Sequence, residues 1–215
     1  QELGWNAGTR YELGLAAKKA LEACREQIAR YLACETDAVV FTSGGTESNN
    51  LGLQACCGQF PKGGVLWTSA TTHPSLAGPV AALDDVWQVV PMPLSAWGGV
   101  DTSRLEALPP PDVVALEWVN NEAGFVQPVD AIAAAAISRN PDACILLDGA
   151  QGLGKLPPPD MSPLAVFTFA GHKIGAPVGI GGMVLRPSLK PTPLTHGGGQ
   201  ERGWRPGTVA VPLIR

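Results

Sequence analysis

The feature that most constrains the fold is a series of short apolar runs, each ending at a glycine, a small residue or a polar residue. The runs cover residues 38–42, 65–69, 86–90, 113–119, 144–147, 166–169 and 182–185. Their length and their β-branched and aromatic content are typical of buried strands. Segments of helical length separate several of them, which indicates βαβ units. We therefore predict an α/β protein with three α/β/α layers around a mainly parallel central sheet.

Helical periodicity supports this fold class. Between residues 11 and 32 an apolar stripe runs from Leu13 to Leu32, and charged residues, among them Arg25, lie mostly opposite it. An alanine-rich helix is expected after Pro128, as far as about Arg139. A further helix is expected to continue the glycine-rich turn at residues 43–48 through residues 49–53. The 45% hydrophobic and 16% charged residues are typical of a globular chain with a sizeable core.

Composition also excludes several function classes. A net charge of −4 supplies no basic field for nucleic acid or anionic lipid. No apolar run approaches the roughly 20 residues that a membrane span needs. The five cysteines lack metal-type spacing and the three histidines leave little to build a zinc site. Reduced thiols are the simplest account, so we predict a cytoplasmic protein without nucleic acid, membrane or metal as partner.

Residues able to do chemistry follow the ends of several expected strands. They are Gly45, Thr46, His73, Asn121, Asp148, Gln151, His172 and Lys173. Taken singly they are ordinary: a solvated lysine, a strand-end aspartate and a loop histidine are common in any protein. The carboxyl ends of parallel strands share one edge of a sheet, however, so these side chains are expected to converge there.

The residue types fit one cofactor. A lysine whose pKa is lowered can form a Schiff base with a carbonyl compound, and a carboxylate can pair with a pyridine nitrogen. The turn at residues 43–48 offers free N–H groups and a helix dipole to a phosphate. It is not a P-loop, because no Gly-Lys-Ser/Thr follows at the required spacing. The set therefore predicts pyridoxal 5'-phosphate.

Five segments, in the same order along the chain, resemble motifs of cysteine desulfurases within the class V aminotransferase family. They are residues 43–50 (SGGTESNN), 120–124 (NNEAG), 148–151 (DGAQ), 171–173 (GHK), and 196–203 (HGGGQERG) with 207–208 (GT). The resemblance covers most of the chain. It implies a pyridoxal-phosphate enzyme of fold type I that acts as a homodimer.

By this resemblance, Lys173 would hold the cofactor covalently and move protons at the substrate α-carbon. Asp148 would keep the pyridine nitrogen protonated, and Gln151 would bond the ring hydroxyl. His73 would stack on the ring and assist proton transfer. Gly45, Thr46 and His172 would hold the phosphate, and Thr208 would reach the partner subunit's phosphate. Asn121 would face the substrate carboxylate and the ring.

The implied reaction removes sulfur from L-cysteine, giving alanine and an enzyme persulfide for a sulfur-acceptor protein in iron–sulfur assembly or RNA thiolation. Residues 1–215 would form the cofactor-binding large domain, incomplete at both ends. The small C-terminal domain, with the nucleophilic cysteine and a substrate-clamping arginine, would lie outside this chain, because none of the five cysteines present has a matching context.

The chain also departs from the family pattern. Ala170 stands where the family has a phosphate-binding serine. The missing hydroxyl would weaken phosphate binding by about 1.5–3 kcal/mol, the contribution of one hydrogen bond to a charged group. Two alternatives therefore stay open. One is a class V aminotransferase or lyase that acts on another amino acid. The other is a non-catalytic, degenerate homologue with a structural role.

Overall fold

The structure is a computed structural model that describes residues 6–214. Within these residues seven strands form one sheet in the order β1-β7-β6-β5-β4-β2-β3. The strands are β1 (Val39–Thr42), β2 (Gly64–Thr68), β3 (Trp87–Pro91), β4 (Val113–Glu117), β5 (Cys144–Asp148), β6 (Val166–Ala170) and β7 (Gly181–Leu185). Strand β7 is antiparallel to both of its neighbours, and the other strands share one direction. The predicted mainly parallel sheet is therefore confirmed.

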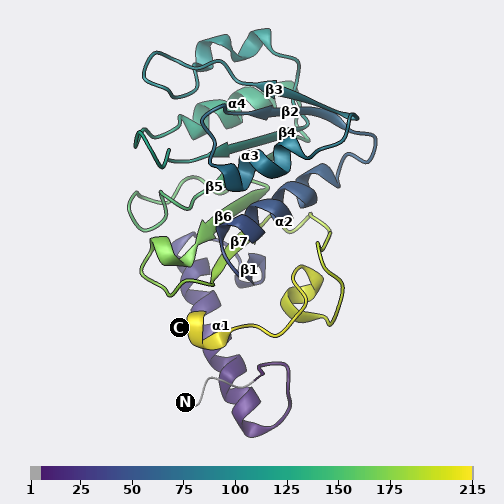
Figure 1. Cartoon of the computed structure of the whole chain (residues 1–215), viewed down its shortest axis with the longest axis vertical. Coiled ribbons are helices and arrows are strands. Elements are labelled where there is room, and N and C mark those ends of the chain that lie inside the picture. The colour runs from purple at the N-terminus through teal and green to yellow at the C-terminus, as the bar shows by residue number, and fades with distance from the viewer. Residues whose placement is uncertain (1–5, 215) are drawn as a thin grey trace.

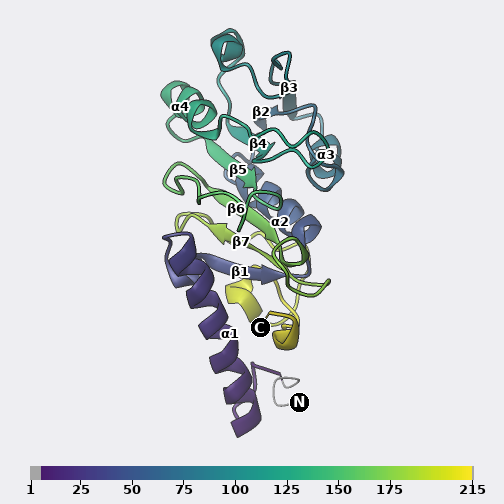
Figure 2. The ribbon, with the colours of Figure 1, turned by 90° about the vertical axis from the view of Figure 1, so that its left-hand side faces the viewer.

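Helices cover both faces of this sheet. Helices α2 (Gly45–Cys57) and α3 (Pro74–Ala81) lie on one face, and α4 (Val129–Arg139) lies on the other, as Figure 2 shows. Alternate residues of β4 serve the two layers: Val113 and Ala115 pack with α2 and α3, while Val114 and Leu116 pack with α4. The three-layer α/β/α fold is thus confirmed, with an apolar core on each face of the sheet.

Helix α1 (Glu12–Tyr31) lies at the β1 edge of the sheet, and its first turns extend beyond it (Figures 1 and 2). Its residues Ala17 and Leu21 pack against Phe41 of β1, Ile180 and Val211 of the short helix α5 (Val211–Ile214). Short 3₁₀ helices complete the elements: η1 (Thr36–Ala38), η2 (Thr102–Ala107), η3 (Gly171–Lys173) and η4 (Gln200–Gly203).

Two residues of α1 correct the expected amphipathic pattern. Arg25, expected on the solvent face, is 1% exposed and forms an ion pair with Glu201. Leu13, expected in the apolar stripe, is exposed. The reason is the placement of α1: its N-terminal turns project past the sheet, whereas its middle faces a C-terminal segment that supplies a buried carboxylate (Figure 2).

A glycine sets how closely α2 approaches the sheet. A Cβ atom at Gly52 would lie 2.8 Å from Cγ1 of Val166 and 3.0 Å from Cδ1 of Leu146. The absence of a side chain lets the helix pack directly on β5 and β6. This contact places the N-terminus of α2 at the carboxyl edge of the sheet, where β6 ends at Ala170. Among residues 6–214, no helix is both long and apolar enough to cross a membrane.

Candidate active site

A cavity of about 190 Å³ opens at the carboxyl edge of the parallel strands. Eight of the nine residues predicted from the sequence line it: Gly45, Thr46, His73, Asn121, Asp148, Gln151, His172 and Lys173. Ala170 and Glu117 also line the cavity. The ninth predicted residue, Thr208, is exposed and does not belong to the lining. The edge of the sheet therefore brings together segments spread over more than half of the chain.

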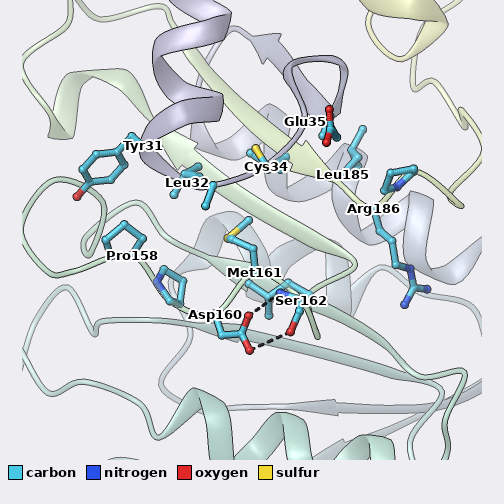
Figure 3. Close-up of a pocket in the computed structure, with 16 residues that line it drawn as sticks. Tyr31, Leu32, Cys34, Glu35, Pro158, Asp160, Met161, Ser162, Leu185 and Arg186 are labelled. Atoms are coloured by element: carbon cyan, nitrogen blue, oxygen red, sulfur yellow. Dashed lines mark hydrogen bonds between the residues drawn. The ribbon is translucent and has the colours of Figure 1, made fainter.

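A larger cavity, of about 600 Å³, lies at the opposite edge (Figure 3). The pairing of Val166 with Leu185 places it there, because Val166 begins β6. Asp160, a carboxylate in the lining of this cavity, accepts hydrogen bonds from the N–H and the hydroxyl of Ser162, both at 2.9 Å. The lining of this larger cavity consists mostly of aliphatic residues and prolines. Size therefore does not identify the site, whereas the convergence of reactive groups does.

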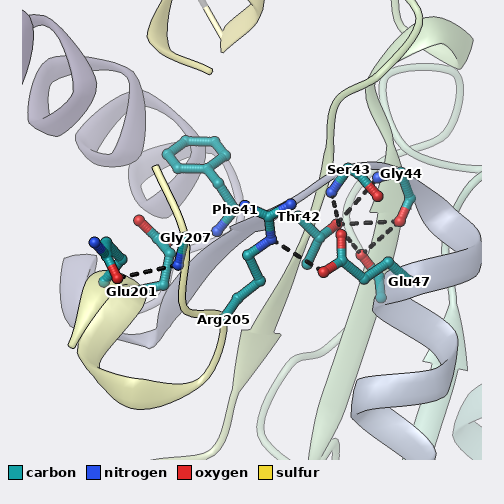
Figure 4. A network of polar contacts seen from close by, with 10 residues as sticks. Phe41, Thr42, Ser43, Gly44, Glu47, Glu201, Arg205 and Gly207 are labelled. Atoms are coloured by element: carbon teal, nitrogen blue, oxygen red, sulfur yellow. Dashed lines mark hydrogen bonds and ion pairs between the residues drawn. The ribbon is translucent and has the colours of Figure 1, made fainter. Parts of the chain in front are cut away.

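Helix α2 forms the anion-binding wall of the site. Gly45 and Thr46 are its first two residues, so their N–H groups have no intrahelical partner, and the positive end of the helix dipole lies at the cavity. The next residue, Glu47, would oppose an anion, but its carboxylate accepts from the Ser43 N–H and pairs with Arg205 at 3.0 Å (Figure 4). Burial raises the pKa of Glu47, and the bonds from Ser43 and Arg205 outweigh it and lower that pKa overall.

Asp148 is a buried carboxylate at the end of β5. Its Oδ1 accepts from the Ala150 N–H at 2.9 Å, and its Oδ2 accepts from Nδ2 of Asn49 at 2.7 Å. Burial raises the pKa of Asp148, against the lowering effect of the two hydrogen bonds and of the nearby His73, and the negative charge of Glu117 adds to the rise. The carboxylate is therefore held in one orientation in an environment that favours its association with a proton.

Asn49 is a site residue to which sequence reasoning gave no role. It is buried in α2, its Oδ1 accepts from the Thr168 hydroxyl at 2.6 Å, and its Nδ2 also donates to Oγ of Ser75 at 2.9 Å. It thus links α2, β6 and α3 beneath Asp148. The available signal was its spacing: Asn49 lies four residues after Gly45, one helical turn along the face that meets the sheet.

His73 is the N-cap of α3, and its Nδ1 accepts from the Ser75 N–H at 3.1 Å. The exposed imidazole is therefore anchored at one nitrogen, with its ring at the cavity. From a distant part of the sequence come His172 and Lys173, which belong to η3, directly after β6. A Cβ atom at Gly171 would lie 2.9 Å from the Ile180 carbonyl oxygen, so glycine permits the tight turn that brings both to the cavity.

Asn121 and Gln151 complete the wall of the cavity. Gln151 accepts from Nζ of Lys155 at 3.0 Å. The loop of Asn121 is shaped by its neighbour Asn120, whose Oδ1 accepts from the N–H groups of Glu122 and Ala123. None of the five cysteines lines this cavity in the part of the chain that the structure describes.

A layered sheet with a lysine, a buried aspartate and a helix N-terminus at one edge is the arrangement found in pyridoxal-phosphate enzymes of fold type I. Solved structures agree. A NifS-like protein superposes with a TM-score of 0.91 at 30% identity, over 98% of this chain and 59% of that chain. The structure described as SspA in complex with cysteine superposes with a TM-score of 0.90 at 31% identity, over 100% of this chain and 63% of that chain.

The family follows from the sequence comparison. Residues 5–205 match the family described as Aminotransferase class-V, and the chain belongs to this family, whose members in general depend on pyridoxal phosphate. Cysteine desulfurase from Homo sapiens is 34% identical over 94% of this chain and 45% of its own length. Cysteine desulfurase IscS from Glaesserella parasuis is 34% identical over 97% of this chain and 52% of its own length. The chain thus spans about half the length of these relatives.

Proposed function

We propose that this chain is the cofactor-binding part of a pyridoxal-phosphate enzyme that removes sulfur from L-cysteine. The observation that carries the proposal is the convergence of Lys173, Asp148 and the N-terminus of α2 on one cavity. Relatives support the proposal, because two proteins named cysteine desulfurase are 34% identical to this chain over 94% and 97% of its length. Further support is a solved relative described as being in complex with cysteine.

The groups around the cavity match pyridoxal phosphate in chemistry. The unpartnered N–H groups of Gly45 and Thr46, with His172 beside them, suit a phosphate. Asp148 suits a protonated ring nitrogen, since burial raises the pKa of this carboxyl and a cation beside it would stabilise its charged form. The Lys173 amine suits a carbonyl carbon. Ala170 contributes only a methyl group, so the phosphate wall has one hydroxyl fewer than the family pattern.

In the proposed reaction, the cofactor would supply an electron sink for the bonds at the substrate α-carbon. Lys173 would hold the cofactor and would take and return a proton at that carbon. Asp148 would keep the proton on the ring nitrogen, and Gln151 would hydrogen-bond the ring hydroxyl. His73 would lie against the ring and assist proton transfers. Asn121 orients the substrate carboxylate.

The remaining parts of the proposal concern the rest of the assembly. We propose that residues 1–215 form the large domain and that a small domain supplies the nucleophilic cysteine. Thr208 is proposed to serve the phosphate of a second subunit in a homodimer, which is consistent with its exposed position outside this chain's own cavity. The persulfide would pass to an acceptor protein, with iron–sulfur assembly in the cytoplasm as the proposed setting.

Product analysis tests the reaction. The full-length protein, loaded with pyridoxal phosphate, is incubated with L-cysteine and a reducing thiol, with Lys173→Ala as control. We expect equal amounts of alanine and sulfide from the natural protein and neither from the variant. Pyruvate and ammonia would instead indicate a lyase, and a keto acid with the amino group transferred would indicate an aminotransferase. Either of these results would overturn the desulfurase proposal, as would a loaded protein that leaves every amino acid unchanged.

A further inference from the structure

Glu117, the last residue of β4, is a buried acid that the proposed reaction does not use. It is 3% exposed, lines the cavity and pairs in register with Asp148 of β5. Burying two adjacent carboxylates costs free energy unless each accepts hydrogen bonds from nearby donors. The partners of Glu117 therefore indicate what its burial achieves.

Three side-chain donors surround this carboxylate. Its Oε1 accepts from Oγ1 of Thr71 at 2.8 Å and from Nε2 of Gln127 at 2.9 Å. Its Oε2 accepts from Oγ1 of Thr72 at 3.0 Å, and the same hydroxyl has the Ser69 carbonyl oxygen as a second acceptor at 2.7 Å. Both threonines lie on the loop between β2 and α3, so Glu117 ties that loop to β4.

The loop tied in this way carries His73. Thr71 and Thr72 are the two residues that precede it, and His73 itself begins α3 as the N-cap. Asn120, three residues beyond Glu117, adds a bond from its Nδ2 to the Thr71 carbonyl at 3.0 Å. The segment leading to the histidine is thus fixed from the β4 side at a backbone carbonyl and at two adjacent side chains.

We propose that Glu117 is a positioning residue whose carboxylate clamps Thr71 and Thr72 and thereby fixes the His73 imidazole at the cavity. The inference rests on the proposed function, in which His73 faces the cofactor ring. A competing role for Glu117 acts on Asp148 through its negative charge, without involving His73. The two roles give different results in the variants described below.

Two substitutions separate the clamp from the charge. Glu117→Leu removes every acceptor, whereas Glu117→Gln keeps the shape and removes only the charge. A glutamine can turn its Oε1 toward Thr71 and Gln127 and donate its amide to Thr72, whose hydroxyl proton then goes to its other acceptor, the Ser69 carbonyl. The clamp therefore predicts that glutamine rescues what leucine loses, and the charge role predicts that it does not.

The first readout needs no cofactor. Amide hydrogen exchange is measured on the cofactor-free chain for residues 69–77, with helix α4 as internal control. Glu117→Leu and Thr72→Val should speed exchange in this segment by at least tenfold and leave α4 unchanged, and Glu117→Gln should remain close to the natural chain. Thr72→Val keeps the side-chain shape, so it decides the question if Glu117→Leu loosens the whole fold. An unchanged loop in Thr72→Val would overturn the clamp.

The second readout is a double-mutant cycle on turnover by the full-length protein. Glu117→Leu should lower kcat on the order of tenfold or more, as displaced catalytic groups do. In a His73→Ala background the same change should cost less than about twofold, because the group it positions is already gone. Full additivity would overturn the proposal and favour the route through Asp148. If the natural protein shows no cofactor-dependent turnover, the proposed function fails, and the exchange measurement still decides the clamp.

Discussion

Arg25 of α1 and Glu201 of η4 form a bidentate ion pair inside the protein although 176 residues separate them. The two N–O distances are 2.9 and 2.8 Å, and both side chains are buried. Glu201 also accepts from the Phe41 N–H at 2.7 Å, and Arg25 donates to the Val39 carbonyl. This cluster fastens the glycine-rich segment before Thr208 to strand β1, at the edge of the sheet.

Removing one member of this pair should be costly. Arg25→Leu leaves a buried carboxylate with only the Phe41 N–H, and we expect a loss of about 3–5 kcal/mol in the free energy of unfolding. Adding Glu201→Gln should recover part of that loss, since glutamine still accepts from Phe41 without carrying a charge. Urea unfolding of the single and double variants measures both effects. A double variant no more stable than Arg25→Leu alone would contradict the account.

Ala170 offers a gain-of-function test of the phosphate wall. We predict that Ala170→Ser tightens pyridoxal phosphate binding by about tenfold or more, because one hydrogen bond to a charged group contributes about 1.5–3 kcal/mol. Equilibrium titration monitored by absorbance gives the dissociation constant. Pyridoxal without the phosphate serves as the matched ligand and should bind both chains equally. An equal improvement for both ligands would place the effect elsewhere than at the phosphate.

The raised pKa of Asp148 gives a pH prediction for the cofactor-free chain. A carboxyl whose pKa is higher folded than unfolded contributes stability at low pH, and that contribution is lost as pH rises through the folded pKa. Asp148→Asn does not titrate. The free energy of unfolding of the natural chain should therefore fall relative to the variant as pH increases from about 4 toward 7, the direction set by this pKa. A constant difference between the two chains over this range would rule out the shift.

Two glycines in neighbouring helices form a matched pair. Gly52→Ala should destabilise the chain by about 1–3 kcal/mol, because the added Cβ would lie 2.8 Å from Val166 and α2 would have to move off the sheet. Gly78→Ala in α3 meets no atom within 4 Å and should stabilise by about 0.5–1 kcal/mol. Thermal or urea unfolding compares them. Equal effects would mean that α2 is not in the close contact described.

Much of the fold follows from local sequence patterns. Apolar runs bounded by glycine and polar residues predict the strands to within a few residues, and the alanine-rich stretch ending at Arg139 predicts α4. The edge cavity follows from one topological rule, because parallel strands deliver the ends of β5 and β6 to the same place.

The errors and omissions have a common physical cause. A charged residue is expected to face solvent unless a partner is known, and the partners here lie far away in sequence. The periodicity of α1 places Arg25 wrongly on the solvent face, because its partner Glu201 comes from the other end of the chain. Glu117 stands within an apolar run, and the sequence predicts no role for it because the donors to its carboxylate lie on other segments. An acid inside a buried strand was itself the available signal.

The central claim is that Lys173 binds pyridoxal phosphate, and its most direct test is covalent trapping. The purified chain is mixed with pyridoxal phosphate, its visible spectrum recorded, and the mixture reduced with borohydride before peptide mass mapping. We predict a visible band that reduction abolishes, with the added mass on Lys173 and no band in Lys173→Ala. Lys155, which donates to Gln151 of the cavity, is the internal control. A colourless chain, or a mass added to Lys155 instead of Lys173, would contradict the account.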